Sequence, residues 1–344
     1  MNKIKNILRF KYSLKQLINY LKFKTNKKKP ILNYRPIWMV LYLSDLCNLR
    51  CKMCPHHSES DNDFKFQKKL DKKFMTIQMV KKIYKKFPET ILVMLGGVGE
   101  PTLHPEFKKI IEISAKNKKK INLISNGTLL NDDMINYMVK EKCFNQISIS
   151  LNASNPYEYS QICSVNKEMF YTVVNNIKKI VDAKKKYNSD VQVVVSGVCS
   201  KEFITASYNF LHFCDTLGVD RIDLHRYIDF DIKDTLNDID DFSVDISNIY
   251  EYAKKNIKTS CSLPHKITSH SYKKQCDWYF KNISFDSYGN LGSCGRVITP
   301  NSEYGNINDQ NDIWNNEYMQ KMRKDFIEKD IVTKYCEKCI ENNK

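Results

Sequence analysis

The sequence has 344 residues, of which 42% are apolar and 12% aromatic, and this composition excludes an intrinsically disordered chain. No secretory signal and no apolar run of the roughly 18 residues that span a membrane is visible, so the twelve cysteines are expected to be reduced or metal-bound in the cytoplasm. The formal net charge is +16, but the whole chain is rich in Lys, Asn and Ile, and we expect no nucleic-acid partner.

Residues 1–29 predict a basic amphipathic helix. The first 30 residues contain ten lysines and arginines and no acidic residue. The apolar side chains that recur at helical spacing are Ile4, Ile7, Leu8, Leu14, Leu17, Ile18 and Leu21. Such a helix can lie in the interface of an anionic membrane, or it can dock on the body of its own protein. We therefore expect an arm and linker over residues 1–36, with weak peripheral contact to the inner face of the membrane as one hypothesis and docking as the alternative.

A loop with three cysteines follows the first predicted strand, residues 37–42. Cys47, Cys51 and Cys54 have the spacing C-x3-C-x2-C. Three thiolates on one loop can hold three irons of a [4Fe–4S] cluster, which normally takes four cysteines, so one iron would stay open for chemistry. The alternatives are a zinc knuckle and three unrelated buried thiols.

Strands and helices alternate after this loop. The apolar runs predict strands over residues 37–42, 91–95, 120–125, 146–151, 191–198 and 221–224, with helical patterns between them. Six such units predict an α/β fold with a parallel sheet and right-handed crossovers. In barrels of this kind the chemistry lies at the carboxyl ends of the strands, where the cysteine loop is expected.

The cysteine spacing, together with the segment LGGVGEP at residues 95–101, resembles the radical S-adenosylmethionine (SAM) enzymes. This resemblance implies a partial (β/α)6 TIM-like barrel over residues 37–230, in which SAM chelates the open iron. It also implies that the reduced cluster cleaves SAM to a 5′-deoxyadenosyl radical, with an electron donor such as flavodoxin or ferredoxin. That radical removes a hydrogen atom from the substrate.

The resemblance further implies which residues contact SAM. The glycine segment would receive its amine, polar residues at the ends of the third and fourth strands would reach its ribose or carboxylate, and a side chain inside the cysteine loop would pack on adenine. The corresponding residues are Met53, Gly97, Gly99, Glu100, Asn126, Ser150 and Asn152. Without the resemblance, these segments would be interpreted as ordinary turns.

Candidate catalytic residues lie at two other strand ends. His225, Arg226 and Tyr227 close the sixth strand, and one of them could take a proton from a substrate radical. The alternative is that they only form hydrogen bonds. Cys199, just after the fifth strand, is a candidate hydrogen-atom donor, although a small buried side chain is the simpler interpretation.

A second set of cysteines lies near the C-terminus, at Cys276, Cys294, Cys336 and Cys339. Four thiolates can close a second [4Fe–4S] cluster or hold a structural zinc ion. The segments YGNI at residues 304–307 and IWN at residues 313–315 resemble the SPASM/Twitch auxiliary-cluster domain of radical SAM enzymes. We therefore expect a small hairpin-helix iron-sulfur domain over residues 276–344, joined to the barrel by an acidic linker at residues 231–275.

The four-cysteine version is similar to the Twitch type of the aminocyclitol alcohol dehydrogenases. This similarity implies an oxidoreductase that converts an alcohol of a sugar or cyclitol to a carbonyl, with the auxiliary cluster as electron acceptor. The alternatives are a peptide-modifying maturase, against which the short segment 1–36 counts, and a radical epimerase. A more remote alternative is a zinc-binding adaptor, which would leave the glycine segment and the strand-end residues unexplained.

Overall fold

The computed structural model describes residues 12–54, 56–58, 74–199, 206–226, 243–263, 276–292, 294 and 300–329. The first half of the chain contains, in order, α2 (Leu14–Thr25), β1 (Trp38–Leu41), α3 (Ile77–Lys86), β2 (Leu92–Leu95), η1 (Pro101–Leu103), α4 (Phe107–Lys116), β3 (Lys120–Ser125), α5 (Asp132–Lys140), β4 (Phe144–Ser150), α6 (Pro156–Cys163) and α7 (Glu168–Lys186). The second half contains β5 (Gln192–Cys199), α8 (Ser207–Asp215), β6 (Arg221–Arg226), α10 (Ser243–Asn256), β7 (Ser260–Ser262), α11 (Trp278–Lys281), β8 (Asn282–Phe285), β9 (Asn290–Gly292), β10 (Asn301–Asn306) and α12 (Glu317–Lys329).

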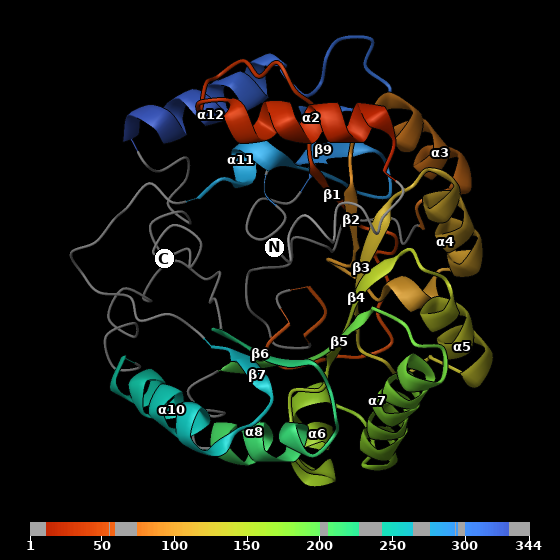
Figure 1. Ribbon diagram of the computed structural model, residues 1–344, viewed down its shortest axis with the longest axis vertical. Helices are drawn as coiled ribbons and strands as arrows, with labels where there is room; N and C mark the ends of the chain where they lie inside the picture. The colour runs from red at the N-terminus through yellow and green to blue at the C-terminus, as the bar shows by residue number, and fades with distance from the viewer. Residues whose placement is uncertain are drawn as a thin grey trace.

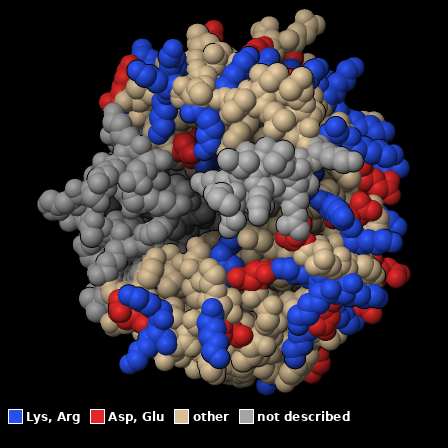
Figure 2. Space-filling view, viewed as in Figure 1, with Lys and Arg blue, Asp and Glu red and all other residues tan. Residues whose placement is uncertain are grey.

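All the described strands belong to one curved sheet, in the order β10-β9-β8-β1-β2-β3-β4-β5-β6-β7. Each of the strands β1 to β6 pairs parallel with its successor, and helices α3 to α8 pack on the outer side of the curve (Figure 1). The predicted α/β fold and its six strands are confirmed, and the arrangement is a partial barrel. Figure 2 shows lysine and arginine side chains scattered over the described surface of one face, among fewer acidic side chains, in keeping with the net charge of +16.

Local sequence signals explain where the helices begin. The side chains of Thr76, Asn131 and Asn155 accept hydrogen bonds from the first turns of α3, α5 and α6. β5 is apolar on both faces, with Val193, Val194 and Val195 fully buried, whereas β4 and β6 alternate apolar side chains with polar ones such as Ser148 and Asp223. These elements carry the loops at the carboxyl ends of the strands.

The C-terminal region continues the barrel sheet. β8 pairs parallel with β1 on the side opposite β2, and β9 and β10 follow antiparallel. The β8–β9 hairpin turns where the sequence predicts it, with Gly289 at a φ of +80°. The stretch expected as an acidic linker contains α10 and the edge strand β7, which pairs with β6. One sheet therefore connects the barrel to the hairpin.

The N-terminal helix α2 docks on this body through its polar side. Gln16 and Asn19 are 1% and 5% exposed, whereas Leu14 and Leu21 are 73% and 62% exposed. The apolar stripe that defines the predicted helix thus points outward. Residues 1–11 of the predicted helix lie outside the described residues. Within the described part of the chain, no helix combines the length and the apolar character needed to cross a bilayer.

Candidate metal and cofactor site

The three-cysteine loop lies just beyond the carboxyl end of β1. Cys47, Cys51 and Cys54 are all partly buried, and the Cys54 N–H donates to the Cys51 carbonyl (2.9 Å), which turns the loop. Burial raises the pKa of Cys47 to about 11 and also raises the pKa of Cys54. Because thiolate is the form that binds metal, a bound cation must supply the charge that stabilises it.

The donor set of the loop can be compared with the two metal groups that three thiols could hold, a zinc ion and an iron-sulfur cluster. Among the described residues, no three His, Cys, Asp or Glu side chains converge closely enough to hold one ion. A cubane cluster instead distributes its thiolates over separate irons, so three partly buried thiols on one turned loop fit that donor set.

The glycine segment after β2 lies directly against the cysteine loop. A Cβ atom at Gly99 would lie 2.3 Å from the Leu46 carbonyl oxygen and 2.4 Å from that of Ser44. At Gly97, where φ is +132°, a Cβ atom would overlap the ring of Tyr42 at 2.2 Å. Both positions therefore require glycine, and the segment leaves room at the strand ends for the backbone to approach a ligand.

Glu100 connects the loops after β2 and β3. Its carboxylate accepts hydrogen bonds from the Thr102 N–H (3.0 Å) and hydroxyl, the Ser125 hydroxyl (2.8 Å) and the Asn126 N–H (2.7 Å). The side chain is 3% exposed, and burial raises its pKa, although these four hydrogen bonds oppose the increase. Glu100, a predicted SAM contact, thus holds Thr102, Ser125 and Asn126 in place through hydrogen bonds.

Asn126 is the polar residue nearest the cysteine loop on this side. The side-chain nitrogen of Asn126 lies 4.0 Å from the Cys47 sulfur, and it donates a hydrogen bond to the side-chain oxygen of Asn48 (2.9 Å). Its own oxygen accepts from the Thr128 N–H (3.0 Å) and hydroxyl (2.7 Å). The predicted residue Asn126 is thus fixed beside a candidate metal ligand, and Asn48 and Thr128 are partners that sequence reasoning missed.

The end of β4 supplies two more predicted residues. Ser150 lies 3.5 Å from the Ser196 hydroxyl of β5, and Asn152, at a φ of +60°, accepts from the Val198 N–H (3.2 Å). Met53 is partly buried within the cysteine loop. The structure brings Gly97, Gly99, Glu100 and Asn126 into one connected set with the loop.

Helix α6 contacts the cysteine loop, and no sequence pattern indicated this contact. The Lys52 N–H donates to the Ile162 carbonyl (2.9 Å), and contact with the Cys163 thiol, together with burial, raises the pKa of Cys51. Tyr159 is fully buried, and its hydroxyl has no hydrogen-bond partner within the described part of the chain. Burial and the neighbouring thiols of Cys163 and Cys51 raise the pKa of Tyr159.

The C-terminal cysteines Cys276 and Cys294 are 8% and 6% exposed, while Cys336 and Cys339 lie outside the described residues. Tyr42, which contacts Gly97, has its pKa raised first by burial and then by Cys294 and Asp286. Tyr42 is therefore packed against the glycine segment and is within electrostatic reach of a C-terminal cysteine.

A second contact joins the two regions. The Ser287 hydroxyl, in the β8–β9 turn, donates to the Asp45 carboxylate of the cysteine loop (2.7 Å), and both side chains are buried. Burial raises the pKa of Asp45, whereas the Ser287 hydrogen bond opposes this increase. Asp45 and Ser287 carry no sequence motif that could have identified them.

The candidate catalytic residues are only partly described. His225 is exposed at the end of β6, and Cys199 of β5 lies opposite Arg226 of β6 in the strand pairing. The side chains of Cys199 and Arg226, and the whole of Tyr227, lie outside the described atoms. These residues stay predictions.

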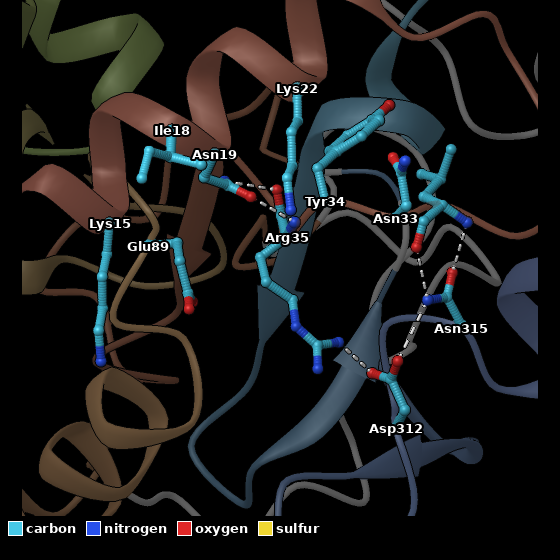
Figure 3. Close-up of a pocket in the computed structure, with 11 residues that line it drawn as sticks. Lys15, Ile18, Asn19, Lys22, Asn33, Tyr34, Arg35, Glu89, Asp312 and Asn315 are labelled. Atoms are coloured by element: carbon cyan, nitrogen blue, oxygen red, sulfur yellow. Dashed lines mark hydrogen bonds and ion pairs between the residues drawn. The ribbon is translucent and has the colours of Figure 1, made fainter.

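A pocket of about 450 Å³ lies elsewhere, between α2 and residues 312–315 (Figure 3). Its walls include Lys15, Lys22 and Arg35, facing Glu89 and Asp312. Arg35 and Glu89 precede β1 and β2, so the pocket lies at the amino ends of the strands, away from the cysteine loop. We therefore assign it no part in the chemistry of the cysteines.

Two family models match the chain. Residues 41–206 match the Radical SAM superfamily, and residues 276–340 match SPASM, described as an iron-sulfur cluster-binding domain. The first match contains the three-cysteine loop together with the strand-end residues. The second contains all four C-terminal cysteines.

Relatives and solved structures agree with these matches. The tungsten-containing aldehyde ferredoxin oxidoreductase cofactor-modifying protein of Pyrococcus furiosus is 23% identical over 331 residues, covering 88% of this chain and 86% of that protein. The GTP 3′,8-cyclase of Pasteurella multocida is 26% identical over 179 residues, covering 50% of each chain.

Among solved structures, native anSMEcpe with bound AdoMet has a TM-score of 0.65 at 17% identity, covering 90% of this chain and 89% of that one. Streptococcus suis SuiB bound to S-adenosylmethionine has a TM-score of 0.64 at 17% identity, covering 93% of this chain and 76% of that one. These two likenesses establish a shared fold.

Proposed function

This chain belongs to the radical SAM superfamily and carries an SPASM domain, and from that premise we propose that it oxidises an alcohol of a sugar or cyclitol to a carbonyl. The cofactors of such an enzyme are a [4Fe–4S] cluster and SAM. In this proposal Cys47, Cys51 and Cys54 hold the first cluster, and the C-terminal cysteines hold a second one. An external donor such as flavodoxin or ferredoxin supplies the first electron.

When bound, the first cluster would supply the electron that cleaves SAM to the 5′-deoxyadenosyl radical, and the second cluster would accept the electron that leaves the substrate. The protein's own residues bind and orient the reactants. The backbone at Gly97 and Gly99 and the amide of Asn126 line the place where SAM would lie. Glu100 keeps the loops that carry them in register through its four hydrogen bonds.

The oxidation is balanced in atoms and electrons. A substrate C–H carbon gives a hydrogen atom to the 5′-deoxyadenosyl radical, which becomes 5′-deoxyadenosine. The carbon radical then loses one electron to the C-terminal acceptor, and its hydroxyl loses one proton, so that a C=O bond forms. His225, Arg226 and Tyr227 are the candidates for receiving that proton.

The observation that supports the proposal is that the strands between Cys276 and Cys294 extend the barrel sheet. β8 pairs directly with β1, the strand that leads into the cysteine loop, and Ser287 of the following turn donates to Asp45 in that loop. Tyr42 lies against Gly97, and Cys294 contributes to raising the pKa of Tyr42. An electron acceptor at Cys294 would thus be near the place where a substrate radical forms, as a two-electron oxidation requires.

The test compares SAM cleavage with substrate oxidation in anaerobically reconstituted protein. Sugars and cyclitols are offered with SAM and a reductant, and 5′-deoxyadenosine and carbonyl product are measured. We expect Cys276→Ala/Cys294→Ala to retain deoxyadenosine formation and to lose the carbonyl product, and Cys54→Ala to lose both. Cys143→Ala, at a buried cysteine just before β4, is the matched control and should retain both.

Other outcomes would change the substrate or reaction class. An epimerised substrate without net oxidation, sensitive to Cys199→Ala, would replace oxidation by epimerisation. Deoxyadenosine without any carbohydrate product would remove the sugar proposal. Zinc in the C-terminal site would remove the proposed electron acceptor and leave SAM cleavage unaffected.

The second candidate is peptide modification. It is favoured by solved structures of the same fold that contain peptides, namely S. suis SuiB bound to precursor peptide SuiA, with a TM-score of 0.62, and anSMEcpe bound to a Cp18Cys peptide, with a TM-score of 0.61. The same assay with cysteine-containing peptides tests it, because loss of two hydrogens from a peptide would be seen by mass spectrometry. That result would favour a maturase over a carbohydrate oxidoreductase.

A further inference from the structure

The outer face of α2 carries a row of uncovered apolar side chains. Leu14, Ile18 and Leu21 are 73%, 45% and 62% exposed, and their i, i+4, i+7 spacing places them on one side of the helix. Contiguous apolar rows of this kind on a protein surface commonly mark contact sites.

The structure fixes this row outward. The Gln16 amide donates to the carbonyls of Thr90 and Lys118, both at 3.1 Å. Asn19 donates to the Arg35 carbonyl (3.0 Å) and accepts from the Arg35 N–H (2.7 Å). Because these buried amides would lose their partners if the helix rotated, the apolar row cannot turn inward without a large penalty.

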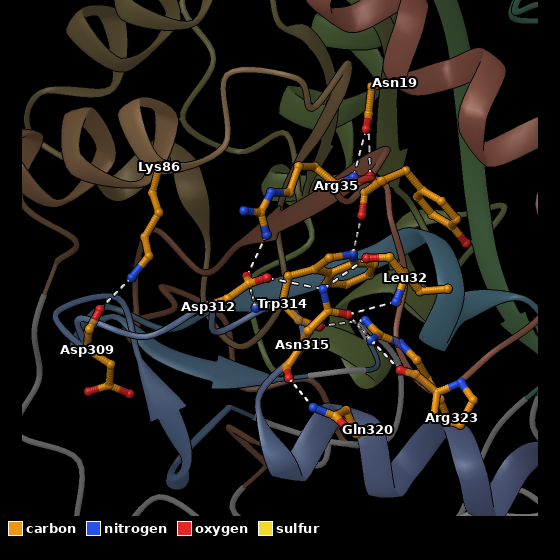
Figure 4. A network of polar contacts seen from close by, with 12 residues as sticks. Asn19, Leu32, Arg35, Lys86, Asp309, Asp312, Trp314, Asn315, Gln320 and Arg323 are labelled. Atoms are coloured by element: carbon orange, nitrogen blue, oxygen red, sulfur yellow. Dashed lines mark hydrogen bonds and ion pairs between the residues drawn. The ribbon is translucent and has the colours of Figure 1, made fainter.

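The linker after α2 is held as firmly (Figure 4). Leu32 exchanges two hydrogen bonds of 3.0 Å with the Asn315 side chain, and the Trp314 indole donates to the Tyr34 carbonyl (2.8 Å). The buried Arg323 guanidinium donates to the Pro30 carbonyl (3.0 Å). The described part of the arm, residues 12–36, is thus held against the body by hydrogen bonds along its length.

Lysines border the apolar row on both sides. Lys15 and Lys22 lie along one edge, beside the pocket of Figure 3, and Lys24 lies along the other, and all three are exposed. The first 30 residues contain no acidic side chain to neutralise them. An apolar row between flanking lysines is the pattern of a helix that lies in a membrane interface, with lysine stems reaching up to the headgroups.

We propose that α2 docks the protein on an anionic lipid bilayer through Leu14, Ile18 and Leu21. Charge selects this occupant over a second copy of the chain, because pairing two such faces would bring two basic arms together. The proposal is independent of the substrate and of the proposed oxidation.

The docked orientation leaves the cysteine site in water. α2 contacts Arg35, Thr90 and Lys118, which precede β1, β2 and β3, whereas the cysteine loop follows β1. The lipid-facing helix and the candidate active site therefore lie at opposite ends of the strands. Membrane binding and SAM cleavage can be measured separately for this reason.

The test is co-sedimentation of the full chain with vesicles of phosphatidylcholine alone and with about 30% phosphatidylglycerol, at low and at high salt. We expect binding only to the anionic vesicles, and weaker binding at high salt. Leu14→Gln/Ile18→Gln/Leu21→Gln should weaken binding by about tenfold per side chain. The control Leu129→Gln/Tyr171→Gln removes apolar side chains that are 45% and 62% exposed elsewhere and should bind like the wild type.

A second pair of variants separates local charge from net charge. Lys15→Gln/Lys22→Gln/Lys24→Gln should weaken binding by about fivefold per lysine at low salt. The control Lys178→Gln/Lys185→Gln/Lys186→Gln makes the same change in net charge on α7 and should have little effect.

Three outcomes would overturn the proposal. The first is that the wild-type protein does not bind anionic vesicles. The second is that the α2 variants bind as well as the control variants. The third is a concentration-dependent dimer that the α2 glutamine variant abolishes. Unchanged thermal unfolding and unchanged SAM cleavage in the α2 variants establish that they fold. A failure of membrane binding would leave the oxidation proposal untouched.

Discussion

Gly99→Ala tests whether close contact between the glycine segment and the cysteine loop holds the metal site together. The added Cβ would lie 2.3 Å from the Leu46 oxygen, 2.8 Å from its nitrogen and 2.4 Å from the Ser44 oxygen. All three atoms are backbone, so no side chain can swing aside. The Leu46 carbonyl would have to recede by about 1 Å to reach ordinary contact, which begins at 3.4 Å.

That displacement also breaks a hydrogen bond. The Glu100 N–H donates to the same Leu46 carbonyl at 2.7 Å, and Leu46 directly precedes the candidate ligand Cys47. Overpacking of this kind costs about 1–3 kcal/mol, and the lost hydrogen bond about 1 kcal/mol more. We expect the free energy of unfolding to fall by about 2–4 kcal/mol, and the three-cysteine loop to retain less iron.

The assay counts iron per chain after anaerobic reconstitution and follows thermal unfolding of the same samples. Gly96→Ala is the matched control, because the closest contact of its Cβ would be the Ile124 Cβ at 3.1 Å, which relaxes with small shifts. Iron at the C-terminal cysteines serves as an internal reference. If Gly99→Ala matches Gly96→Ala in both iron content and stability, the close contact does not support the site.

Three further predictions concern buried polar groups. Arg323→Lys should lower the free energy of unfolding by about 2–4 kcal/mol in chemical denaturation, because lysine cannot reproduce the guanidinium hydrogen bonds to the carbonyls of residues 30, 279 and 314. Tyr159→Phe should leave the cluster-free protein as stable, or up to about 1–2 kcal/mol more stable, because the buried Tyr159 hydroxyl lacks a hydrogen-bond partner in the described structure. The same substitution should make the reduction potential of the N-terminal cluster more negative in a redox titration, and an unchanged potential would contradict this. Burial lowers the pKa of Lys119 from 10.5 to about 7 in the folded protein. Between these two pH values the unfolded chain holds a proton on Lys119 that the folded chain has lost, so the free energy of unfolding should rise with pH across this range. Lys119→Met should remove this slope, at most about 1.4 kcal/mol per pH unit in unfolding experiments, and an identical slope in both proteins would refute the assignment.

The sequence was sufficient for features that depend on local pattern. β1, β2 and β5 contain nearly continuous apolar runs, whereas β4 and β6 alternate apolar and polar residues, and both patterns made the positions of the strands predictable. The residues after each strand could then be placed at one edge of the sheet. Gly99 and Asn126, which were named from the family resemblance, do lie beside the cysteine loop. A methyl group added at Gly99 would lie 2.4 Å from the Ser44 oxygen, and the Asn126 amide lies 4.0 Å from the Cys47 sulfur.

Contacts between distant segments could not be predicted in this way. Tyr159 and Cys163 belong to a helix that begins more than a hundred residues after Cys51, and no spacing rule connects them. The pairing of β8 with β1 was equally hidden, because a small hairpin can form a separate sheet or extend an existing one with the same residues. The β8–β1 pairing is accompanied by the hydrogen bond between Asp45 and Ser287, two residues that meet only in the folded chain.

α2 shows why an amphipathic pattern does not by itself identify the buried face. The periodic leucines and isoleucines predicted the helix, but burial was decided by where hydrogen bonds were needed. The amino ends of parallel strands present backbone carbonyls, such as those of Thr90 and Arg35, which need donors when they are covered. Gln16 and Asn19 supply such donors, and leucines there would remove the side-chain donors to the Lys118 and Arg35 carbonyls. The polar face is therefore the one that fits the protein, and the apolar face remains available for a bilayer.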